Sequence, residues 1–404
     1  MSFKLLNIST MYKGYLNSFY NRFIEAKKLT YSEHLALLLN DSTEFVSSYN
    51  KTFRRLGIDS ECIIANDNEL QKKWCIENLT GKNRNPDILG AQVAKSQPDV
   101  LWIDNLSFTD KEWLNGIRKT VKSIKLVVGY YCSPFNSKIF ERFMYVDLLF
   151  TCTPGLEQEM TKNGIKCYHV YHGFDTDLLG RIAKETNEKK HDFIFSGSLT
   201  TGGKFHGERI AFIEELLKAG VDMDLFVNIE NKYKIKAKQM LHLIYNLLSK
   251  SNVENLEKRL PLLEYGSKPV SGYSEKLLQR LEPPVYGIDM YNLFFNSKTI
   301  LNYHVGIAGN YAGNMRLFEV TGIGSCLLTD NKKNMNDLFV TGNEIITYDN
   351  PQDCIQKVLW LLDHEAEREK IAHSGQQRTL KSHTVENRCL TMIDILNKEL
   401  RWRS

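Results

Sequence analysis

The residues between positions 310 and 330 have the types and spacing of a nucleotide-binding turn. A glycine-bearing loop leads into a short helical pattern from about Asn314, and a buried apolar strand follows. Arg316 and Glu319 are three residues apart, so they lie on one face of that helix. An arginine there can form two parallel hydrogen bonds to phosphate oxygens. The carboxylate one turn on can accept hydrogen bonds from both ribose hydroxyls. A surface Arg–Glu pair explains the spacing equally well.

The helix start adds a second reason to expect a diphosphate. A helix that begins after small residues exposes unpaired backbone N–H groups at its positive dipole end, which suits an anion. The predicted nucleotide-binding residues of this stretch are Asn314, Arg316, Leu317 and Glu319.

A second turn with phosphate-binding chemistry lies between Phe195 and Arg209. A strand pattern ends near Gly197, and further glycines, His206 and Arg209 then lead into a helix. Glycines allow a close approach of the backbone, and the cationic side chains favour an anion. The turn does not have the spacing of a P-loop or of a G-x-G-x-x-G fingerprint. The alternative is a flexible surface loop.

Three residues of the amino-terminal half are candidates for proton transfer in a group-transfer reaction. Asp104 follows an apolar strand pattern, His34 lies on a helix after the first loop, and His172 ends the last strand of that half. Each also has a structural alternative, such as a turn former or a buried, satisfied histidine.

No metal site is expected from the sequence. His169 and His172 would point to opposite faces of a strand. No D-x-D-like pair stands out as a holder of a divalent ion, and the eight cysteines are scattered without a C-x-x-C pair. They are interpreted as reduced, packed thiols.

The elements that must position these residues follow a strand–helix alternation, which predicts an α/β fold with parallel sheets. The 404 residues suffice for two domains, and the alternation restarts after a polar stretch at Thr176–Lys190. Two Rossmann-like lobes would then face each other across a cleft. The expected strands are Lys4–Ile8, Glu61–Ala65, Val100–Asp104, Lys125–Tyr131, Asp147–Thr151, Cys167–Tyr171, Asp192–Phe195, Asp224–Val227, Thr299–Tyr303, Ser325–Thr329 and Glu344–Tyr348.

The stretch Asn231–Gln279 interrupts the alternation and predicts a helical insertion in the second lobe. Its closely spaced lysines favour a solvated helix pair, and the alternative is docking on a membrane surface. No run approaches the length of a membrane span, and no secretory leader is expected, so we expect a cytoplasmic protein, with the inner membrane face as the alternative. A formal charge of +4 excludes a dedicated nucleic-acid binder.

The carboxyl half also resembles a known family. Asn314-x-Arg316-x-Phe318-Glu319, followed by Gly324 and Leu328-Thr329-Asp330, is similar to the spore-maturation-protein (CgeB-like) glycosyltransferases, as is the tail around His383-Thr384 and Arg388. These are GT-B relatives of the large group 1 retaining family. The resemblance covers about 286–395, and the amino-terminal lobe resembles the family more loosely.

The resemblance implies that Glu319 contacts ribose, that Arg316 or Arg209 contacts the diphosphate, and that the last helix packs back on the first lobe. The expected division is 1–180 for an acceptor-binding lobe, 181–385 for a nucleotide-sugar-binding lobe, and 386–404 for the returning helix. In one respect the chain departs from many retaining relatives. They carry a second carboxylate eight positions before the ribose-binding one, where this chain has Tyr311.

We therefore expect a metal-independent, hexosyltransferase-like enzyme of cell-envelope polysaccharide synthesis. Its donor would be a nucleotide-diphosphate sugar, with no separate cofactor, and its acceptor a glycan, a lipid-linked glycan or a protein. Two alternatives remain open: a nucleotide-sugar epimerase on the same fold, and a non-catalytic protein that binds a glycan or a partner.

Overall fold

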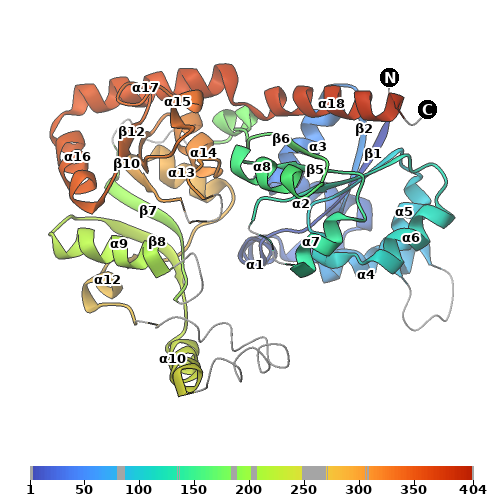
Figure 1. Cartoon of the computed structure of the whole chain (residues 1–404), viewed down its shortest axis with the longest axis horizontal. Coiled ribbons are helices and arrows are strands. Elements are labelled where there is room, and N and C mark those ends of the chain that lie inside the picture. Colours follow the sequence, from blue (N-terminus) through green and yellow to red (C-terminus); the bar gives the residue numbers. More distant parts are fainter. Residues whose placement is uncertain are drawn as a thin grey trace.

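The computed structural model shows two α/β lobes side by side (Figure 1). It describes residues 3–79, 87–133, 135, 137–182, 189–201, 207–247, 270, 272–304, 306 and 309–402. Each lobe contains a six-stranded sheet, and every strand pairs with its neighbours in parallel. The predicted fold class is confirmed.

The first sheet has the strand order β2-β1-β3-β4-β5-β6. Its strands are β1 (Lys4–Ser9), β2 (Asp59–Ile64), β3 (Val100–Ile103), β4 (Leu126–Tyr130), β5 (Leu148–Thr151) and β6 (Cys167–His169). The helices of this lobe are α1 (Lys13–Arg22), η1 (Ile24–Lys28), α2 (Tyr31–Asp41), α3 (Phe45–Arg55), α4 (Asn68–Asn78), α5 (Ile88–Ser96), η2 (Leu106–Phe108), α6 (Lys111–Thr120), α7 (Ser137–Phe143) and α8 (Pro154–Lys162).

The second sheet has the strand order β12-β11-β10-β7-β8-β9. Its strands are β7 (His191–Leu199), β8 (Asp224–Ile229), β9 (Leu281–Glu282), β10 (Ser297–Asn302), β11 (Cys326–Asp330) and β12 (Ile346–Tyr348). The remaining helices are η3 (Thr176–Gly180), α9 (Gly207–Lys218), α10 (Lys232–Leu247), α12 (Glu275–Gln279), α13 (Ile288–Phe295), α14 (Arg316–Ile323), α15 (Met335–Leu338), α16 (Pro351–Asp363), α17 (Glu365–Ser382) and α18 (Val385–Arg401).

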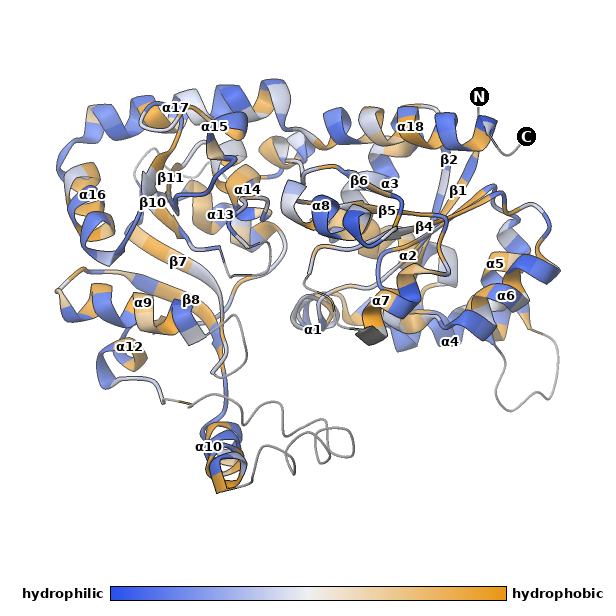
Figure 2. Cartoon of the chain, viewed as in Figure 1, coloured by the Kyte–Doolittle hydropathy of each residue, from blue (hydrophilic) through white to orange (hydrophobic). Residues whose placement is uncertain are grey.

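Both sheets are buried on both faces, as the continuous apolar runs of their strands require. In β3, Val100 and Trp102 belong to one hydrophobic cluster, whereas Leu101 and Ile103 belong to another on the opposite face. Strands β10 and β11 divide their side chains between two clusters in the same way. Hydropathy colouring shows the apolar residues concentrated along the strands (Figure 2).

The carboxyl-terminal helix returns to the first lobe. Helices α17 and α18 follow one another along one edge of the molecule, α17 over the second lobe and α18 over the first (Figure 1). Cys389, Met392 and Leu396 of α18 are fully buried in the same cluster as Trp102 of β3. Glu399 is held from the first lobe by Lys166 at 2.5 Å and by the Tyr168 hydroxyl at 2.6 Å. The helix therefore covers one face of the first sheet.

The two chain crossings between the lobes are hydrogen-bonded to each other. The N–H of Phe174 donates to the carbonyl of His383 at 2.8 Å, and the N–H of Val385 donates to the carbonyl of Phe174 at 2.9 Å. A Cβ on Gly173 would lie 2.7 Å from the backbone of Thr384. Only a residue without a side chain permits this approach, so the crossings form one closely packed joint.

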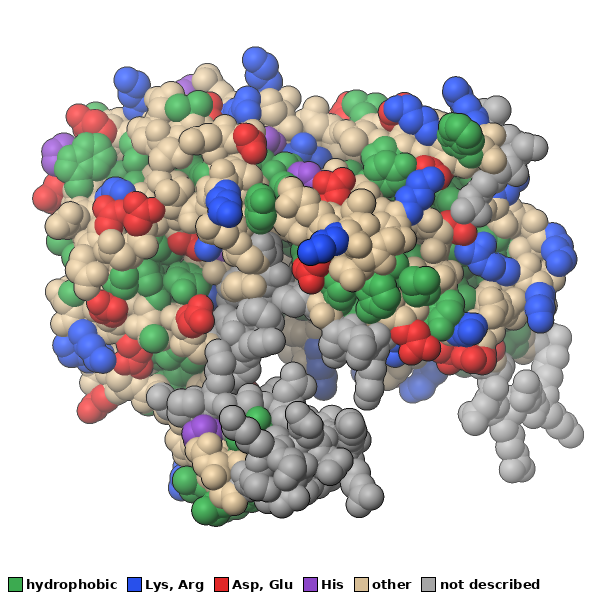
Figure 3. All heavy atoms as spheres, in the orientation of Figure 1, with side chains coloured by type: hydrophobic (Ala, Val, Ile, Leu, Met, Phe, Trp, Pro, Cys, Tyr) green, Lys and Arg blue, Asp and Glu red, His purple; other side chains and the backbone are tan. Residues whose placement is uncertain are grey.

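The insertion in the second lobe begins with α10, which projects away from the lobe (Figure 1). It ends with the short helix α12, while residues 248–269 of the predicted insertion lie outside the described part of the chain. Among the helices described, none is both long and apolar enough to span a membrane. Positive and negative side chains are interspersed over the face in Figure 3, which shows no basic stripe there.

Candidate functional site

A cleft of about 790 Å³ lies between the lobes and is lined by residues of both. In the first lobe the lining includes Ser9 at the end of β1 and Asp104 after β3. In the second lobe it includes Ser198 near the end of β7 and Asn302 at the end of β10. In each sheet, the order of connections reverses between these two strands, and ligands bind at such switch points. The volume is in the range of pockets that hold ligands of nucleotide-sugar size.

Arg209 of α9 presents a buried positive charge to the cleft. Its guanidinium donates to the carbonyls of Ser198 at 3.2 Å and Tyr303 at 3.0 Å, and its Nε is buried without a partner. Within the described residues no carboxylate lies at ion-pair distance from it. Burial lowers the pKa of Arg209 to about 10, so it stays protonated at neutral pH. Such a cation is suited to an anionic ligand.

Arg316 and Glu319 also line the cleft, but Arg316 is already engaged. Its Nη1 lies 2.8 Å from Glu319 Oε2, its Nη2 donates to the carbonyl of Ser196 at 3.1 Å, and its guanidinium lies over the Phe294 ring. The Tyr291 hydroxyl donates to the other oxygen of Glu319 at 3.4 Å. The pair is neither a surface pair nor a free phosphate clamp. Arg316 instead orients the Glu319 carboxylate.

Two further predicted nucleotide-binding residues line the same part of the cleft. Asn314 precedes α14, and its Nδ2 donates to Asn302 Oδ1 at 2.7 Å. Gly197 lies beside Arg209, since a Cβ there would come within 3.9 Å of the Arg209 Nη1 atom and 3.2 Å of the Phe195 ring. The predicted residue His206 lies outside the described residues.

Leu317 does not contribute a side chain to the cleft. It is fully buried in the core of the second lobe, and its N–H already donates to the carbonyl of Asn314. Helix α14 begins at Arg316, so the side chain at position 317 turns away from the face that carries Arg316 and Glu319.

Asp104 and His172 lie on the first-lobe side of the cleft. Oδ1 of Asp104 accepts from the Trp102 indole at 2.6 Å, and Oδ2 has no hydrogen-bond partner. Burial raises the pKa of Asp104 to about 6, although the side chains of Ser9, Trp102 and Asn7 oppose the shift. Nδ1 of His172 lies 3.2 Å from the Tyr130 hydroxyl.

His34 is placed away from the cleft. Its side chain on α2 is fully buried, stacked on Phe19 and 3.3 Å from the Tyr20 hydroxyl. Burial lowers the pKa of His34, so the neutral ring is favoured in this apolar setting. The structure therefore assigns His34 to the core between α1, α2 and α4, and it does not line the cleft.

The structure adds a carboxylate that the sequence did not reveal. Glu44 precedes α3 at its N-cap position and lines the cleft, and both of its carboxylate oxygens accept from the N–H of Tyr12, at 3.1 and 3.3 Å. Burial raises the pKa of Glu44 to about 7, while the Tyr12 N–H opposes the shift. Nothing in the local sequence separates this residue from an ordinary helix cap.

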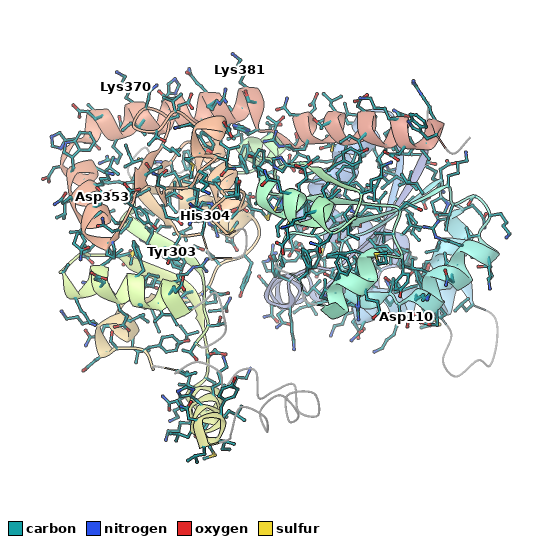
Figure 4. All side chains as sticks on the ribbon, viewed as in Figure 1. Asp110, Tyr303, His304, Asp353, Lys370 and Lys381 are labelled. Carbon is teal, nitrogen blue, oxygen red and sulfur yellow. The ribbon has the colours of Figure 1, made fainter. Side chains whose placement is uncertain are left out.

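A histidine–aspartate pair in the second lobe, His304 and Asp330, was also not identified from the sequence. Tyr303 and His304 follow β10 (Figure 4), and His304 donates to Asp330 Oδ1 from its backbone N–H at 2.9 Å. The Nδ1 atom lies 2.7 Å from the same oxygen, and Nε2 is buried without a partner. Burial raises the pKa of Asp330, but the charges of His304 and Lys332 and the hydrogen bonds from His304 outweigh burial and hold this pKa below its usual value. Both residues end neighbouring strand patterns, which is the signal that points to them.

The raised pKa of Asp104 predicts a pH-dependent gain of stability in Asp104→Asn. A carboxyl whose folded pKa exceeds its unfolded value binds its proton more tightly in the folded state, so it loses stability as pH rises between about 4 and 6. The free energy of unfolding of Asp104→Asn, relative to wild type, should rise by about 2 to 3 kcal/mol across this window. Urea titrations at both ends of the window measure it.

Asp99, at the other end of β3, provides a control of opposite sign. Burial raises the pKa of Asp99, but the N–H of Lys4 and the ammonium of Lys125 outweigh burial and hold this pKa below its usual value. The stability of Asp99→Asn relative to wild type should therefore fall as pH rises. Parallel pH dependences for the two variants would contradict the burial of an uncompensated charge at Asp104.

Comparisons with known proteins agree with this architecture. Residues 249–394 match a family model described as glycosyl transferase-like. A glycosyltransferase from Rickettsia africae ESF-5 superposes with a TM-score of 0.55 at 10% identity, over 99% of both chains. No curated protein matches the sequence at a significant level.

Two other solved structures of the same fold contain sugar nucleotides or their parts. HepE of Anabaena, in complex with UDP and glucose, superposes with a TM-score of 0.57 at 11% identity, over 98% of this chain and all of that one. An alpha-glucosyltransferase in complex with UDP-glucose and DNA gives 0.55 at 13% identity, with the same coverage. At these identities the likeness shows the fold, which is GT-B. Together with the family-model match, it supports a glycosyltransferase.

Proposed function

We propose that the chain transfers a sugar from a nucleoside-diphosphate donor, bound by the second lobe, to an acceptor bound by the first. The observation that carries this proposal is the environment of Arg209. Its guanidinium is largely shielded from water, donates hydrogen bonds only to backbone carbonyls and lies over the Phe195 ring. A shielded charge of this kind costs free energy unless an anion joins it. A diphosphate supplies that anion, and Glu319 on α14 supplies the acceptor for ribose hydroxyls. HepE, with the same fold, is described with UDP and glucose.

We infer that no divalent metal is needed at the diphosphate. Arg209 offers positive charge, and α14 directs its amino-terminal turn toward the cleft, since Gly313, Asn314 and Met315 all line it. His304 has an Nε2 without a partner in the same half of the cleft, and this atom can donate to the leaving group when the ring is doubly protonated.

On the acceptor side we propose Asp104 as the group that accepts the proton of the attacking hydroxyl. It follows β3 at the switch point of the first sheet, and burial brings its pKa close to neutral, where a general base is most effective. This role corresponds to direct displacement with inversion. Glu44 is the competing candidate, and the variants Asp104→Asn and Glu44→Gln distinguish the two.

The acceptor proposed is a glycan or lipid-linked glycan of the cell envelope, reached at the cytoplasmic face of the membrane. Support comes from α10, which exposes Met240, Leu243 and Leu247 at 65%, 64% and 85%. Lys234 and Lys236 are exposed on the same helix. Apolar side chains flanked by lysines favour adsorption to an anionic lipid surface.

Nucleotide binding tests the donor half of the site. Arg209→Gln should weaken binding of UDP, GDP or dTDP by about 10- to 100-fold, the effect of one or two charge-assisted hydrogen bonds. The same substitution should leave binding of the free nucleoside unchanged, whereas Glu319→Gln should weaken both. Calorimetry and thermal shift, which also reports whether each variant is folded, measure these affinities.

Arg280→Gln provides the matched control, because Arg280 pairs with Asp222 in the same lobe but outside the cleft. It should bind every nucleotide like wild type. If no nucleoside diphosphate binds, or if Arg280→Gln loses as much as Arg209→Gln, the proposed donor site is wrong.

The pH profile of turnover tests the acceptor half. With release of nucleoside diphosphate as the readout, kcat/KM should rise with pH and level off above a midpoint of about 6 if Asp104 is the base, or about 7 if Glu44 is. Asp104→Asn should then lower turnover by about 10²- to 10⁴-fold with nucleotide affinity unchanged. Near-normal turnover in Asp104→Asn and loss in Glu44→Gln would transfer the role to Glu44. Normal turnover in both would refute a carboxylate base.

Sedimentation with anionic lipid vesicles tests the membrane surface. Replacing Leu243 and Leu247 together by serine should reduce the bound fraction several-fold, because each leucine contributes roughly 1.5–3 kcal/mol when fully buried. Leu359→Ser, at an exposed leucine of α16, should bind like wild type. Equal binding by all three proteins would remove α10 as a membrane contact.

A further inference from the structure

Three side chains with metal-binding chemistry meet at the floor of the cleft on the first-lobe side. Cys132 follows β4, Cys152 follows β5 and His172 follows β6, and these strands are neighbours in the sheet. One ligand atom from each residue lies within 4.8 Å of the others. All three residues line the cleft.

We propose that Cys132, Cys152 and His172 bind a Zn²⁺ ion, with the fourth coordination position open to the cleft. Two thiolates and one imidazole form a known ligand set for this ion, and three protein ligands leave one position for water or another oxygen. With Zn–S bonds of about 2.3 Å and tetrahedral angles, two sulfurs lie about 3.8 Å apart. Closing from at most 4.8 Å requires a movement of about 1 Å or less.

The surroundings of His172 favour a fixed ligand. The Tyr130 hydroxyl lies 3.2 Å from its Nδ1, and the Nε of Arg388 on α18 donates to its carbonyl at 3.0 Å. Hydrogen bonds of this kind orient the ring of a metal-bound histidine. The ring and backbone are therefore both held before any ion arrives.

The position of the cluster sets it apart from the other cysteines. Cys62, Cys167, Cys326, Cys354 and Cys389 are buried in hydrophobic clusters and do not line the cleft, and Cys75 lies on α4 away from it. Cys152 also belongs to a hydrophobic cluster, with Cys132 packed against it, but both of these cysteines line the cleft. In the described part of the chain, this is the one group of three or more potential ligands found close together. Packed thiols need no histidine beside them and no access to a cleft.

Binding of Zn²⁺ here does not depend on the proposed glycosyl transfer. The three ligands lie in the first lobe, whereas Arg209 and Glu319 belong to the second. Metal binding and nucleotide binding are therefore separate measurements, and either can fail without the other.

Cobalt substitution tests the site on the full-length, reduced protein. One equivalent of Co²⁺ should produce thiolate-to-metal absorption in the near ultraviolet and the visible bands of a tetrahedral ion, and Zn²⁺ should abolish both. Competition with a chromophoric chelator gives the affinity. Cys132→Ser, Cys152→Ser and His172→Gln should each weaken binding at least about 10- to 100-fold, the loss that accompanies removal of even an outer hydrogen bond.

Cys75→Ser is the matched control and should bind the ion like wild type. The cooperative thermal unfolding transition of each variant, measured without metal or nucleotide, reports whether the fold is retained. The absence of thiolate–cobalt absorption in the reduced wild-type protein would overturn the proposal whatever the variants do. Equal losses in Cys75→Ser would also overturn it. So would a reduced protein that fails to bind Zn²⁺ but forms a Cys132–Cys152 disulfide with oxidised glutathione, since the pair would then be a thiol switch.

Discussion

The geometry of the cleft depends on the joint at Phe174, where the chain crosses between the lobes in both directions. Backbone hydrogen bonds tie Phe174 to His383 and Val385, and a Cβ on Gly322 of α14 would lie 2.3 Å from the Phe174 ring. The helix that carries Glu319 therefore packs directly on the joint. Gly173 and Gly322 have no side chains, so the backbone and the Phe174 ring pack closely against them. This close packing makes the joint stiff.

Parallel strands impose the second constraint. Because all carboxyl ends of a parallel sheet lie at one edge, each lobe offers its polar loop residues on a single side, and the two sides face each other here. The chemistry divides accordingly. The second lobe brings a cation, Arg209, and an oriented carboxylate, Glu319, while the first brings Asp104, Glu44 and the Cys132–Cys152–His172 cluster. In the proposed reaction, donor binding and acceptor activation thus come from different sheets.

Burial shifts the pKa values of the charged groups in the cleft, and it makes their charged forms unfavourable for stability. It raises the pKa of Asp104 to about 6 and of Glu44 to about 7, and lowers that of Arg209 to about 10. Each shift marks a charged form that the fold disfavours, and such groups persist where function uses them. The contrast with Arg316 is instructive. Its charge is already matched by Glu319, so it stabilises the site's geometry and leaves Arg209 as the group with free capacity for an anion.

Most strand and helix patterns, and the residues that follow the strands, can be predicted from the sequence alone. The two-residue strand β9 is too short to give a pattern and is not predicted. Periodicity predicts β3 and places Asp104 directly after it, and the three-residue spacing of Arg316 and Glu319 places both on one face of α14. Local pattern cannot say which residues meet across elements. The tertiary structure turns Leu317 into the core, removes His34 from the cleft, and brings Glu44 to it. It also brings Cys132, Cys152 and His172 together, although each is 20 residues from the next along the chain. The physical reason is that the order of strands in the sheet, set by crossovers and core packing, decides which strand ends become neighbours.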